Sequence, residues 1–267
     1  MKYIGIRGHR GAGKKSVTYL LGNTIEYLIM KEKNQNNIKT SFDDAYNTWV
    51  QHIMDDESIY YTTALKYVYF DSFGDTLKIF VHLLTGIPTD YIYNDYYKDH
   101  TVINLKDFTY KTHKELPNNI LTKDEVYSLM NKPGNPTAIT KNIYITLREF
   151  ILYFGIDVMQ RYFGLNVWVK ALKQSENNFD DDLLGLDCNY KIFSDVKTPS
   201  EVTYILDNGG CIIHVTRPNN HKKPKGFDKL SKDGRIDYTI HVGGDLYEIK
   251  NQILEIAKQI IDKNGKN

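Results

Sequence analysis

The residues best suited to chemistry lie in a glycine-rich loop near the start of the chain. Gly8-His9-Arg10-Gly11-Ala12-Gly13-Lys14 has the spacing G-x-x-x-x-G-K, between an alternating apolar run over 2–6 and a helix-periodic run over 16–30. Glycines let backbone amides approach phosphate oxygens, and the N-terminus of the following helix adds partial positive charge. We therefore predict a phosphate-binding loop in which Lys14 bridges the β- and γ-phosphates of a nucleotide.

The position of the next hydroxyl narrows the class of nucleotide-binding protein. Lys15 directly follows Lys14, so the hydroxyl expected to help hold Mg²⁺ stands at Ser16. Nucleoside monophosphate kinases commonly have this spacing, whereas P-loop GTPases and motors usually place Ser or Thr directly after the lysine. The sequence also has no base-reading N-K-x-D segment. Both features favour a small-molecule kinase over a nucleotide-dependent switch.

Cations elsewhere in the chain suit phosphoryl transfer, which brings several negative charges together and depends on positioning and cationic stabilisation. Arg148 lies in the first turn of a predicted helix, where a cation opposes the macrodipole by roughly 0.3–1 kcal/mol and an anionic partner would offset that cost. Arg161 lies further along this helix, and Lys78 follows Asp75 in a helix predicted over 75–84. The alternative for Arg148 and Arg161 is an ordinary ion pair. Lys78 could instead be a solvated helix residue, and Asp75 a helix cap.

Asp195 ends a strand predicted over 190–196, at the edge where parallel sheets place their ligands. There it could hold a magnesium-bound water or orient the base or sugar of a substrate, and a cap for the next helix is the alternative. Lys197 would face the same cleft as a point charge, without the bidentate fork of Arg.

Further segments resemble, in chain order, the deoxynucleoside monophosphate kinases of phages and related elements. Residues 72–78, S-F-G-D-T-L-K, are similar to that family's S-F-A-D-x-L-K. The segments T-L-R-E at 146–149, G-I-D at 155–157 and Arg161 are similar to T-x-R-E…G-T-D…R, and N-V-W-V at 166–169 follows. D-V-K-T-P-S-E at 195–201 resembles D-V-R-x-P-x-E, and 209–218 resembles G-G-x-x-I-x-V-x-R-P. The resemblance runs from residue 3 to about 250, and Lys197 replaces the family's Arg.

The resemblance implies a transferase that uses ATP and Mg²⁺ to convert a deoxynucleoside monophosphate to its diphosphate. It also implies that the basic segment Arg217 to Arg235 is a lid that closes over the donor phosphates and excludes water. The expected ATP-binding residues are Gly8, Arg10, Gly11, Ala12, Gly13, Lys14, Lys15, Ser16 and Arg217. The expected substrate-binding residues are Asp75, Lys78, Arg148, Asp157, Arg161 and Trp168. The expected catalytic residues are Lys14, Arg148, Asp195 and Lys197, and Ser16 and Asp195 would hold the metal.

Two other functions stay open. One is a P-loop kinase for another small acceptor, such as dephospho-coenzyme A or a nucleoside. The other is a catalytically weak nucleotide-binding protein, because Lys15 and Lys197 depart from the usual pattern.

Short apolar runs that alternate with helical patterns predict an α/β protein with the three-layer P-loop kinase fold and a mostly parallel five-stranded sheet flanked by helices. We expect one domain over 1–267, with a substrate-binding insertion over about 87–145, where the pattern is irregular, and the lid-like loop over about 217–235. The expected strands are 2–6, 67–70, 190–196, 211–215 and 236–242.

Composition excludes several classes of protein. With 34 basic and 33 acidic residues, the net charge of +1 gives no overall field for duplex nucleic acid or acidic membranes. No apolar stretch approaches the roughly 20 residues of a membrane helix. The two cysteines suit a reducing cytoplasm, the host's if the protein is viral. The partners expected are therefore small nucleotides, and the sequence leaves the oligomeric state open, a homodimer included.

Overall fold

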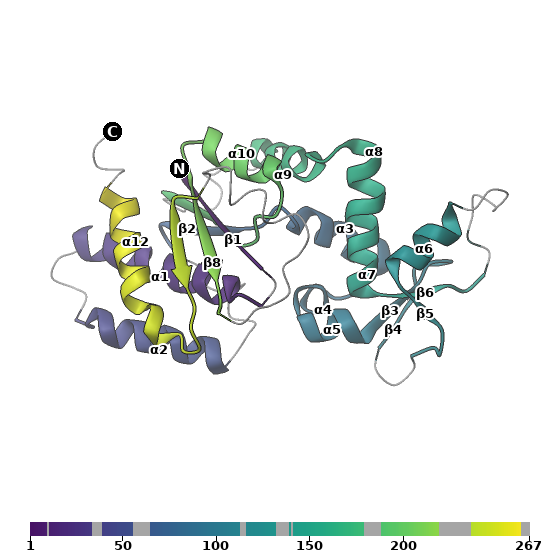
Figure 1. Ribbon diagram of the computed structural model, residues 1–267, viewed down its shortest axis with the longest axis horizontal. Coiled ribbons are helices and arrows are strands. Elements are labelled where there is room, and N and C mark those ends of the chain that lie inside the picture. Colours follow the sequence, from purple (N-terminus) through teal and green to yellow (C-terminus); the bar gives the residue numbers. More distant parts are fainter. Residues whose placement is uncertain are drawn as a thin grey trace. The chain divides into compact units, whose positions relative to one another are not determined.

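The computed structural model describes residues 1–9, 11–33, 39–55, 65–112, 116–131, 139, 141–178, 188–218 and 236–262. The chain divides into two compact units. Unit 1 comprises Met1–Phe73 and Glu176–Asn267, and unit 2 is the continuous segment Gly74–Ser175 (Figure 1). Unit 2 therefore extends beyond both ends of the insertion that the sequence predicts over 87–145.

Unit 1 is built on a five-stranded sheet with the strand order β2-β7-β1-β8-β9, in which every neighbouring pair is parallel. The strands are β1 (Lys2–Gly8), β2 (Val68–Asp71), β7 (Tyr190–Phe193), β8 (Cys211–Thr216) and β9 (Tyr238–His241). Each overlaps a strand that the sequence predicts. The α/β class and the parallel five-stranded sheet are therefore confirmed.

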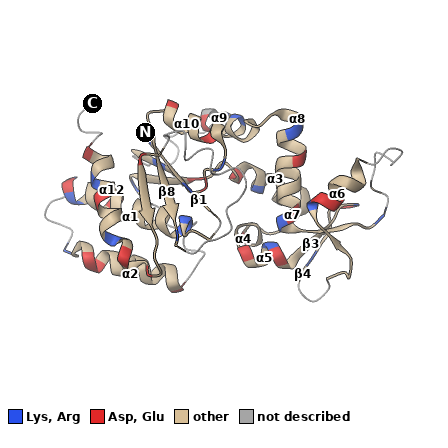
Figure 2. Ribbon diagram, in the orientation of Figure 1, with Lys and Arg blue, Asp and Glu red and all other residues tan. Residues whose placement is uncertain are grey.

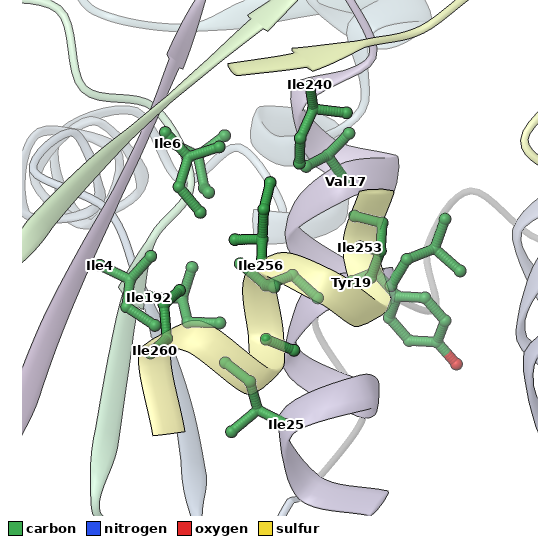
Figure 3. Packing of buried hydrophobic residues seen from close by; sticks show 14 of the residues in the cluster. Ile4, Ile6, Val17, Tyr19, Ile25, Ile192, Ile240, Ile253, Ile256 and Ile260 are labelled. Carbon is green, nitrogen blue, oxygen red and sulfur yellow. The ribbon is translucent and has the colours of Figure 1, made fainter. Parts of the chain in front are cut away.

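One face of this sheet packs against three helices: α1 (Lys14–Lys33), α2 (Phe42–Asp55) and α12 (Lys250–Asp262). Ile4 and Ile6 of β1 belong to the same buried cluster as Val17 and Ile253 from the helices (Figure 3). Gly22 of α1 lies so close to Phe70 that a Cβ atom at this position would be 2.3 Å from the ring. A larger residue there would force the Phe70 ring to move, so glycine permits this close approach of the helix to the sheet.

The opposite face packs against α10 (Pro199–Asp207), which completes the third layer. A Cβ atom at Gly5 of β1 would lie 2.6 Å from Ile205 of this helix, which shows how closely the two elements pack. The start of α10 has a capping box, because Thr198 accepts a hydrogen bond from the Glu201 amide and Glu201 accepts one from the Thr198 amide. This pair of bonds fixes the first turn of the helix.

Unit 2 contains a second, four-stranded sheet with the order β4-β3-β6-β5. Its strands are β3 (Thr101–Asn104), β4 (Tyr110–Thr112), β5 (Ile120–Leu121) and β6 (Tyr144–Thr146). Its shorter helices are α3 (Asp75–Thr85), α4 (Thr89–Tyr93), α5 (Asp95–His100), α6 (Lys123–Met130), α7 (Leu147–Leu152) and α8 (Arg161–Phe163). The irregular pattern over 88–140 does not predict the elements found there, because they are too short to display a period.

The predicted helix that contains Arg148 and Arg161 is interrupted by a π-helical segment, Tyr153–Gln160. The carbonyl oxygen of Gly155 accepts a hydrogen bond of 3.2 Å from the indole N–H of Trp168, which begins the next helix, α9 (Val167–Asn178). A Cβ atom at Gly155 would lie 2.5 Å from Leu77 of α3. Segments of this kind widen a helix locally and often occur at functional sites.

The surfaces of the helices are polar. Charges of both signs lie along α12, whereas α2 carries aspartates and no lysine or arginine (Figure 2). Among the residues that the structure describes, no helix combines the length and apolar character needed to cross a membrane.

Candidate phosphate and acceptor sites

The glycine-rich loop leads from the carboxyl end of β1, the central strand, into α1. Gly11 and Gly13 have φ angles of 79° and 92°, in the left-handed region that residues with a side chain rarely adopt. A Cβ atom at Gly8 would lie 2.4 Å from the carbonyl oxygen of Val215 in β8. All three glycines of the predicted motif are thus required by the backbone, and Arg10 lies outside the described residues.

Lys14 begins α1 and folds back over the loop. Its Nζ donates hydrogen bonds of 3.0 Å to the carbonyl oxygens of Gly8 and His9. The same atom lies 3.8 Å from Oδ1 of Asp195, and 16% of the side chain is exposed. The ammonium group is therefore held over the loop, where the sequence predicts nucleotide phosphates.

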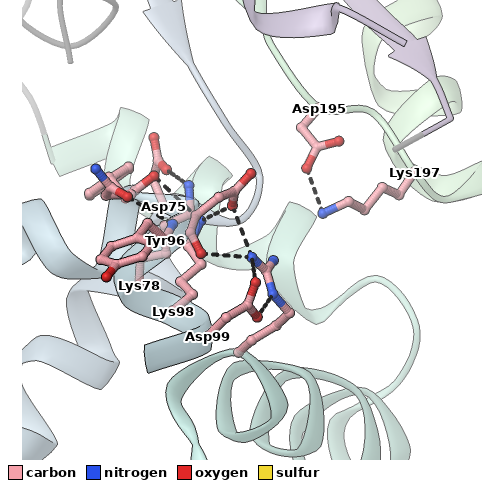
Figure 4. Close-up of polar contacts among 11 residues, drawn as sticks. Asp75, Lys78, Tyr96, Lys98, Asp99, Asp195 and Lys197 are labelled. Carbon is pink, nitrogen blue, oxygen red and sulfur yellow. Dashed lines mark hydrogen bonds and ion pairs between the residues drawn. The ribbon is translucent and has the colours of Figure 1, made fainter. Parts of the chain in front are cut away.

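Asp195 follows β7 and is held at the carboxyl edge of the sheet, because the next residue, Val196, donates its amide to the carbonyl of Ile6. Its Oδ2 lies 2.5 Å from Nζ of Lys197 (Figure 4). Asp195 thus lies between two ammonium groups, those of Lys14 and Lys197. The structure brings these three predicted catalytic residues together.

The residues expected to hold Mg²⁺ fit a nucleotide-bound ion. No cluster of three metal-binding side chains (His, Cys, Asp or Glu) occurs within the described ranges of the chain. Mg²⁺ in nucleotide sites needs only one or two protein oxygens, because phosphates and water complete its octahedral shell. Ser16, two residues beyond Lys14 in α1, and the carboxylate of Asp195 supply oxygens of this kind.

Basic side chains continue along this edge of the sheet. His214 of β8 is the strand partner of Arg7 in β1, and Arg7 is almost fully buried. Burial, with the nearby Arg7, His9 and His241, lowers the pKa of His214 to about 4. His214 is therefore neutral at pH 7, while the buried Arg7 contributes positive potential beside the phosphate loop.

Arg217, directly after β8, reaches the loop through a hydrogen bond of 3.4 Å from Nη1 to the carbonyl oxygen of Gly11. Its position agrees with the predicted role in ATP binding. Residues 219–235, which make up the rest of the predicted lid, lie outside the described residues, so the lid stays a prediction.

In unit 2, Arg148 lies in the first turn of α7 and is bound by two acids of α5. Its Nε and Nη2 donate to the two carboxylate oxygens of Asp99, with a distance of 3.0 Å for Nη2. Nη2 also lies 3.1 Å from the carbonyl oxygen of Asp95 and 3.4 Å from its carboxylate. Burial lowers the pKa of Arg148, but Asp99 and Asp95 raise it more, so the guanidinium is charged.

The start of α7 has only half of a capping box. Thr146 accepts a hydrogen bond from the Glu149 amide. The carboxylate of Glu149 instead accepts a hydrogen bond of 2.9 Å from the amide of Lys123, at the start of α6. The acid thus links two helices of unit 2 at the turn that carries Arg148.

Two other predicted substrate residues belong to the same polar network as Arg148 (Figure 4). Lys78 lies 2.8 Å from Asp75 on α3, and its Nζ lies 4.3 Å from the ring centre of Tyr93. Lys98 connects this group to α5, because its Nζ is 3.0 Å from Asp95 and 3.4 Å from the carbonyl oxygen of Tyr93. Asp75, Lys78 and Arg148 are therefore joined through α4 and α5.

The remaining predicted substrate residues face other partners. Asp157 lies 3.4 Å from Lys123, and the guanidinium of Arg161 lies 4.9 Å from the ring centre of Tyr127, both partners being on α6. Trp168 is only 8% exposed within the core of unit 2. Trp168 therefore packs in this core, and its contact with a substrate stays a prediction.

Sequence reasoning overlooked Asp95 and Asp99. Their spacing of four residues places both on one face of a helix, and Lys98 adds a cation three residues after the first acid. That spacing could have identified an acidic helix face, but nothing in the sequence pairs it with Arg148, 49 residues after Asp99.

A shallow depression of about 450 Å³ lies at the opposite edge of the main sheet. It is lined by Met1, Lys2, Asn189, Tyr190, Asn208 and Gly209. Parallel sheets bind ligands at the carboxyl ends of their strands, and these residues lie at the amino ends of β1 and β7. The depression therefore does not alter the location of the candidate site.

Comparison with family models and with curated proteins found no match to this sequence. The functional interpretation consequently depends on the geometry of the residues themselves.

Proposed function

We propose that this protein transfers the terminal phosphoryl group of ATP to a deoxynucleoside monophosphate. The observation that carries the proposal is the phosphate loop at the carboxyl end of the central strand, with left-handed Gly11 and Gly13 and with Lys14 beside Asp195. Its sheet has the order β2-β7-β1-β8-β9. Backbone amides at such a loop and helix N-terminus favour bound phosphate.

Each group has a role in this reaction. Backbone amides of the loop hold the β- and γ-phosphates, and Lys14 exchanges its carbonyl partners for phosphate oxygens and stabilises the charge that develops during transfer. Ser16 and Asp195 would hold Mg²⁺, which would supply charge neutralisation at the phosphates of bound ATP. Asp195 also orients Lys14 and Lys197, whose ammonium groups balance charge on the transferred group.

Arg148 favours an acceptor that already carries a phosphate. Asp99 and Asp95 already offset the cost of a cation at the first turn of α7, so the support comes from the shape of the guanidinium. A planar guanidinium matches the geometry of phosphate oxygens. This supports a monophosphate acceptor over a nucleoside. We place the reaction in the cytoplasm, the host's if the protein is viral, where ATP and monophosphates are both present.

The test is product identification after incubation of the purified protein with ATP, Mg²⁺ and one acceptor at a time. Each deoxynucleoside monophosphate, each ribonucleoside monophosphate, a nucleoside mixture and dephospho-coenzyme A are compared. We expect a deoxynucleoside diphosphate and ADP in equal amounts. Lys14→Ala is the negative control.

Other outcomes separate the alternatives. Phosphorylation of a nucleoside or of dephospho-coenzyme A would replace the acceptor and retain the kinase class. Tight ATP binding with no transfer to any acceptor would indicate a nucleotide-binding protein and contradict the proposal.

A further inference from the structure

We propose that Asp99 is a positioning residue that fixes the guanidinium of Arg148 in the orientation that receives the acceptor phosphate. This inference rests on the proposed function, in which Arg148 binds the acceptor. Neither a sequence motif nor the family resemblance points to Asp99. The pair joins α5 and α7, two helices of the same compact unit.

The hydrogen bonds of Arg148 occupy one edge of its guanidinium. Asp99 accepts from Nε and Nη2, and the main-chain oxygen of Asp95 accepts from Nη2 as well. Within the described part of the chain, Nη1 donates no hydrogen bond. Because the guanidinium is rigid and planar, fixing the Nε edge also fixes the direction of the two N–H groups on Nη1.

The local charges leave Arg148 able to attract an anion. Asp95 has its own cation, since Lys98 lies 3.0 Å from its carboxylate. Asp99 balances the charge of Arg148. The formal charges of Asp95, Asp99, Lys98 and Arg148 therefore sum to zero. No excess negative charge at this network repels an incoming phosphate, while the Nη1 hydrogens supply a local positive potential.

The benefit of the pair is preorganisation. An arginine side chain carries about 2 kcal/mol of rotamer entropy, which an unrestrained side chain would lose when it binds its ligand. The contact with Asp99 restrains Arg148 before the acceptor arrives, so less of this entropy is lost on binding. Removal of Asp99 should therefore weaken binding of the monophosphate without affecting ATP.

The test compares Asp99→Ala, Asp99→Asn, Arg148→Ala and the double variant Asp99→Ala/Arg148→Ala with the wild-type protein. Asp43→Ala, at an exposed ion pair with Lys250 in unit 1, is the matched control. KM is measured for the monophosphate and for ATP, and binding of the monophosphate alone is measured by calorimetry. Thermal unfolding identifies any variant that fails to fold.

We expect Asp99→Ala to raise KM and Kd for the monophosphate about tenfold, the scale of a hydrogen bond to a charged group, with KM for ATP unchanged. Asp99→Asn, which keeps one acceptor oxygen, should give a smaller increase and serves as the second variant if the alanine variant does not fold. In the Arg148→Ala background the Asp99 substitution should add no further increase, because the group that Asp99 positions is absent.

Three results would overturn the inference. A lower KM for the monophosphate in Asp99→Ala would mean that Asp99 competes with the acceptor. An unchanged KM would mean that Asp99 has no role. If the Asp99 substitution raised this KM equally in the Arg148→Ala background, Asp99 would act independently of Arg148. If the wild-type protein binds the monophosphate through Arg148 and Asp99 but makes no product, the proposed function fails and the positioning role survives. Absence of monophosphate binding by the wild-type protein contradicts both.

Discussion

Lys14 is the residue on which the proposed chemistry depends most. Its ammonium group hydrogen-bonds to loop carbonyls and lies near Asp195, and the residue does not belong to the buried hydrophobic cluster of unit 1. We expect Lys14→Ala to lower turnover by at least about 100-fold, as loss of a charge-stabilising donor does elsewhere, while the melting temperature stays near the wild-type value. Steady-state kinetics and calorimetric melting measure the two quantities.

A control variant tests whether the loss of turnover is specific to Lys14 or follows from the loss of any lysine of α1. Lys31, exposed in the last turn of the same helix, is replaced by Ala. Normal turnover is expected for Lys31→Ala. A well-folded Lys14→Ala variant that retains wild-type turnover would remove Lys14 from the reaction.

His214 gives stability a dependence on pH. Its folded-state pKa of about 4 is below the ordinary value of 6.5, because burial and the nearby Arg7, His9 and His241 oppose protonation. The unfolded chain therefore binds more protons, and the contribution of His214 to stability is complete above pH 6.5 and is lost as the pH falls toward 4.

We expect His214→Gln to lose less unfolding free energy than the wild-type protein between pH 7 and pH 4.5. Urea unfolding at several pH values gives this difference, and His52→Gln, at an exposed position of α2, is the comparison. Parallel pH curves for the wild-type protein and His214→Gln would show that His214 does not cause the dependence.

At the scale of single residues, the sequence predicts what a local motif encodes. Gly8, Gly11, Gly13 and Lys14 follow from spacing alone, because adjacent backbone groups build the loop. Asp99 could not be found in this way, since its role depends on a fold that brings α5 to α7.

At the scale of elements, a buried ion network joins β2, β7 and α9. Nζ of Lys191 lies 2.8 Å from Asp71 and 2.6 Å from Glu176, and its side chain is 8% exposed. Burial lowers the pKa of Lys191, but the two carboxylates raise it more. Tyr204 of α10 also donates a hydrogen bond to Glu176. The network around Lys191 therefore connects α10 as well as β2, β7 and α9.

We expect Lys191→Met to reduce the free energy of unfolding by about 3–5 kcal/mol, because removing one partner leaves buried carboxylates uncompensated. Chemical denaturation followed by circular dichroism measures this loss. Lys250→Met, which breaks an exposed pair with Asp43, should cost about 0–1 kcal/mol. Equal losses in the two variants would contradict the account.

The sequence predicts the elements of unit 1 better than those of unit 2, for a physical reason. The strands of the main sheet are apolar runs that mostly end close to a glycine, a serine or an acid, and β8 is followed by Arg217 and Pro218, so both pattern and boundary are visible. In unit 2, β5 has two residues and β4 three, too few to show alternation. The π-helical segment is also invisible to a search for a 3.6-residue period, since its hydrogen bonds span one residue more than those of an α-helix.

At the scale of the whole molecule, the proposed donor and acceptor residues belong to different compact units. The phosphate loop and Asp195 lie in unit 1, whereas Arg148 and Asp99 lie in unit 2. We expect ATP with Mg²⁺ to slow amide hydrogen exchange at the loop of unit 1, and the monophosphate alone to slow it in α5 and α7. Exchange followed by mass spectrometry reports both regions in one experiment.

The stabilisation of the folded state by a bound nucleotide follows from mass action. ATP at 100 times its Kd should stabilise the folded state by about 2.7 kcal/mol. Asp99→Ala should require about ten times more monophosphate for the same protection and leave the protection by ATP unchanged. Protection of unit 1 alone by both nucleotides would place the acceptor elsewhere.

The strand order has a consequence for synthesis on the ribosome. The first two strands of the main sheet, β1 and β2, do not pair with each other, because both pair with β7. Unit 2, a continuous segment, is translated completely before Tyr190–Phe193 emerges. Unit 2 can therefore fold before β7 is available to pair with β1 and β2. Long-range pairing of this kind is slow. A chain stalled before residue 190 should expose the apolar strands β1 and β2 to chaperones.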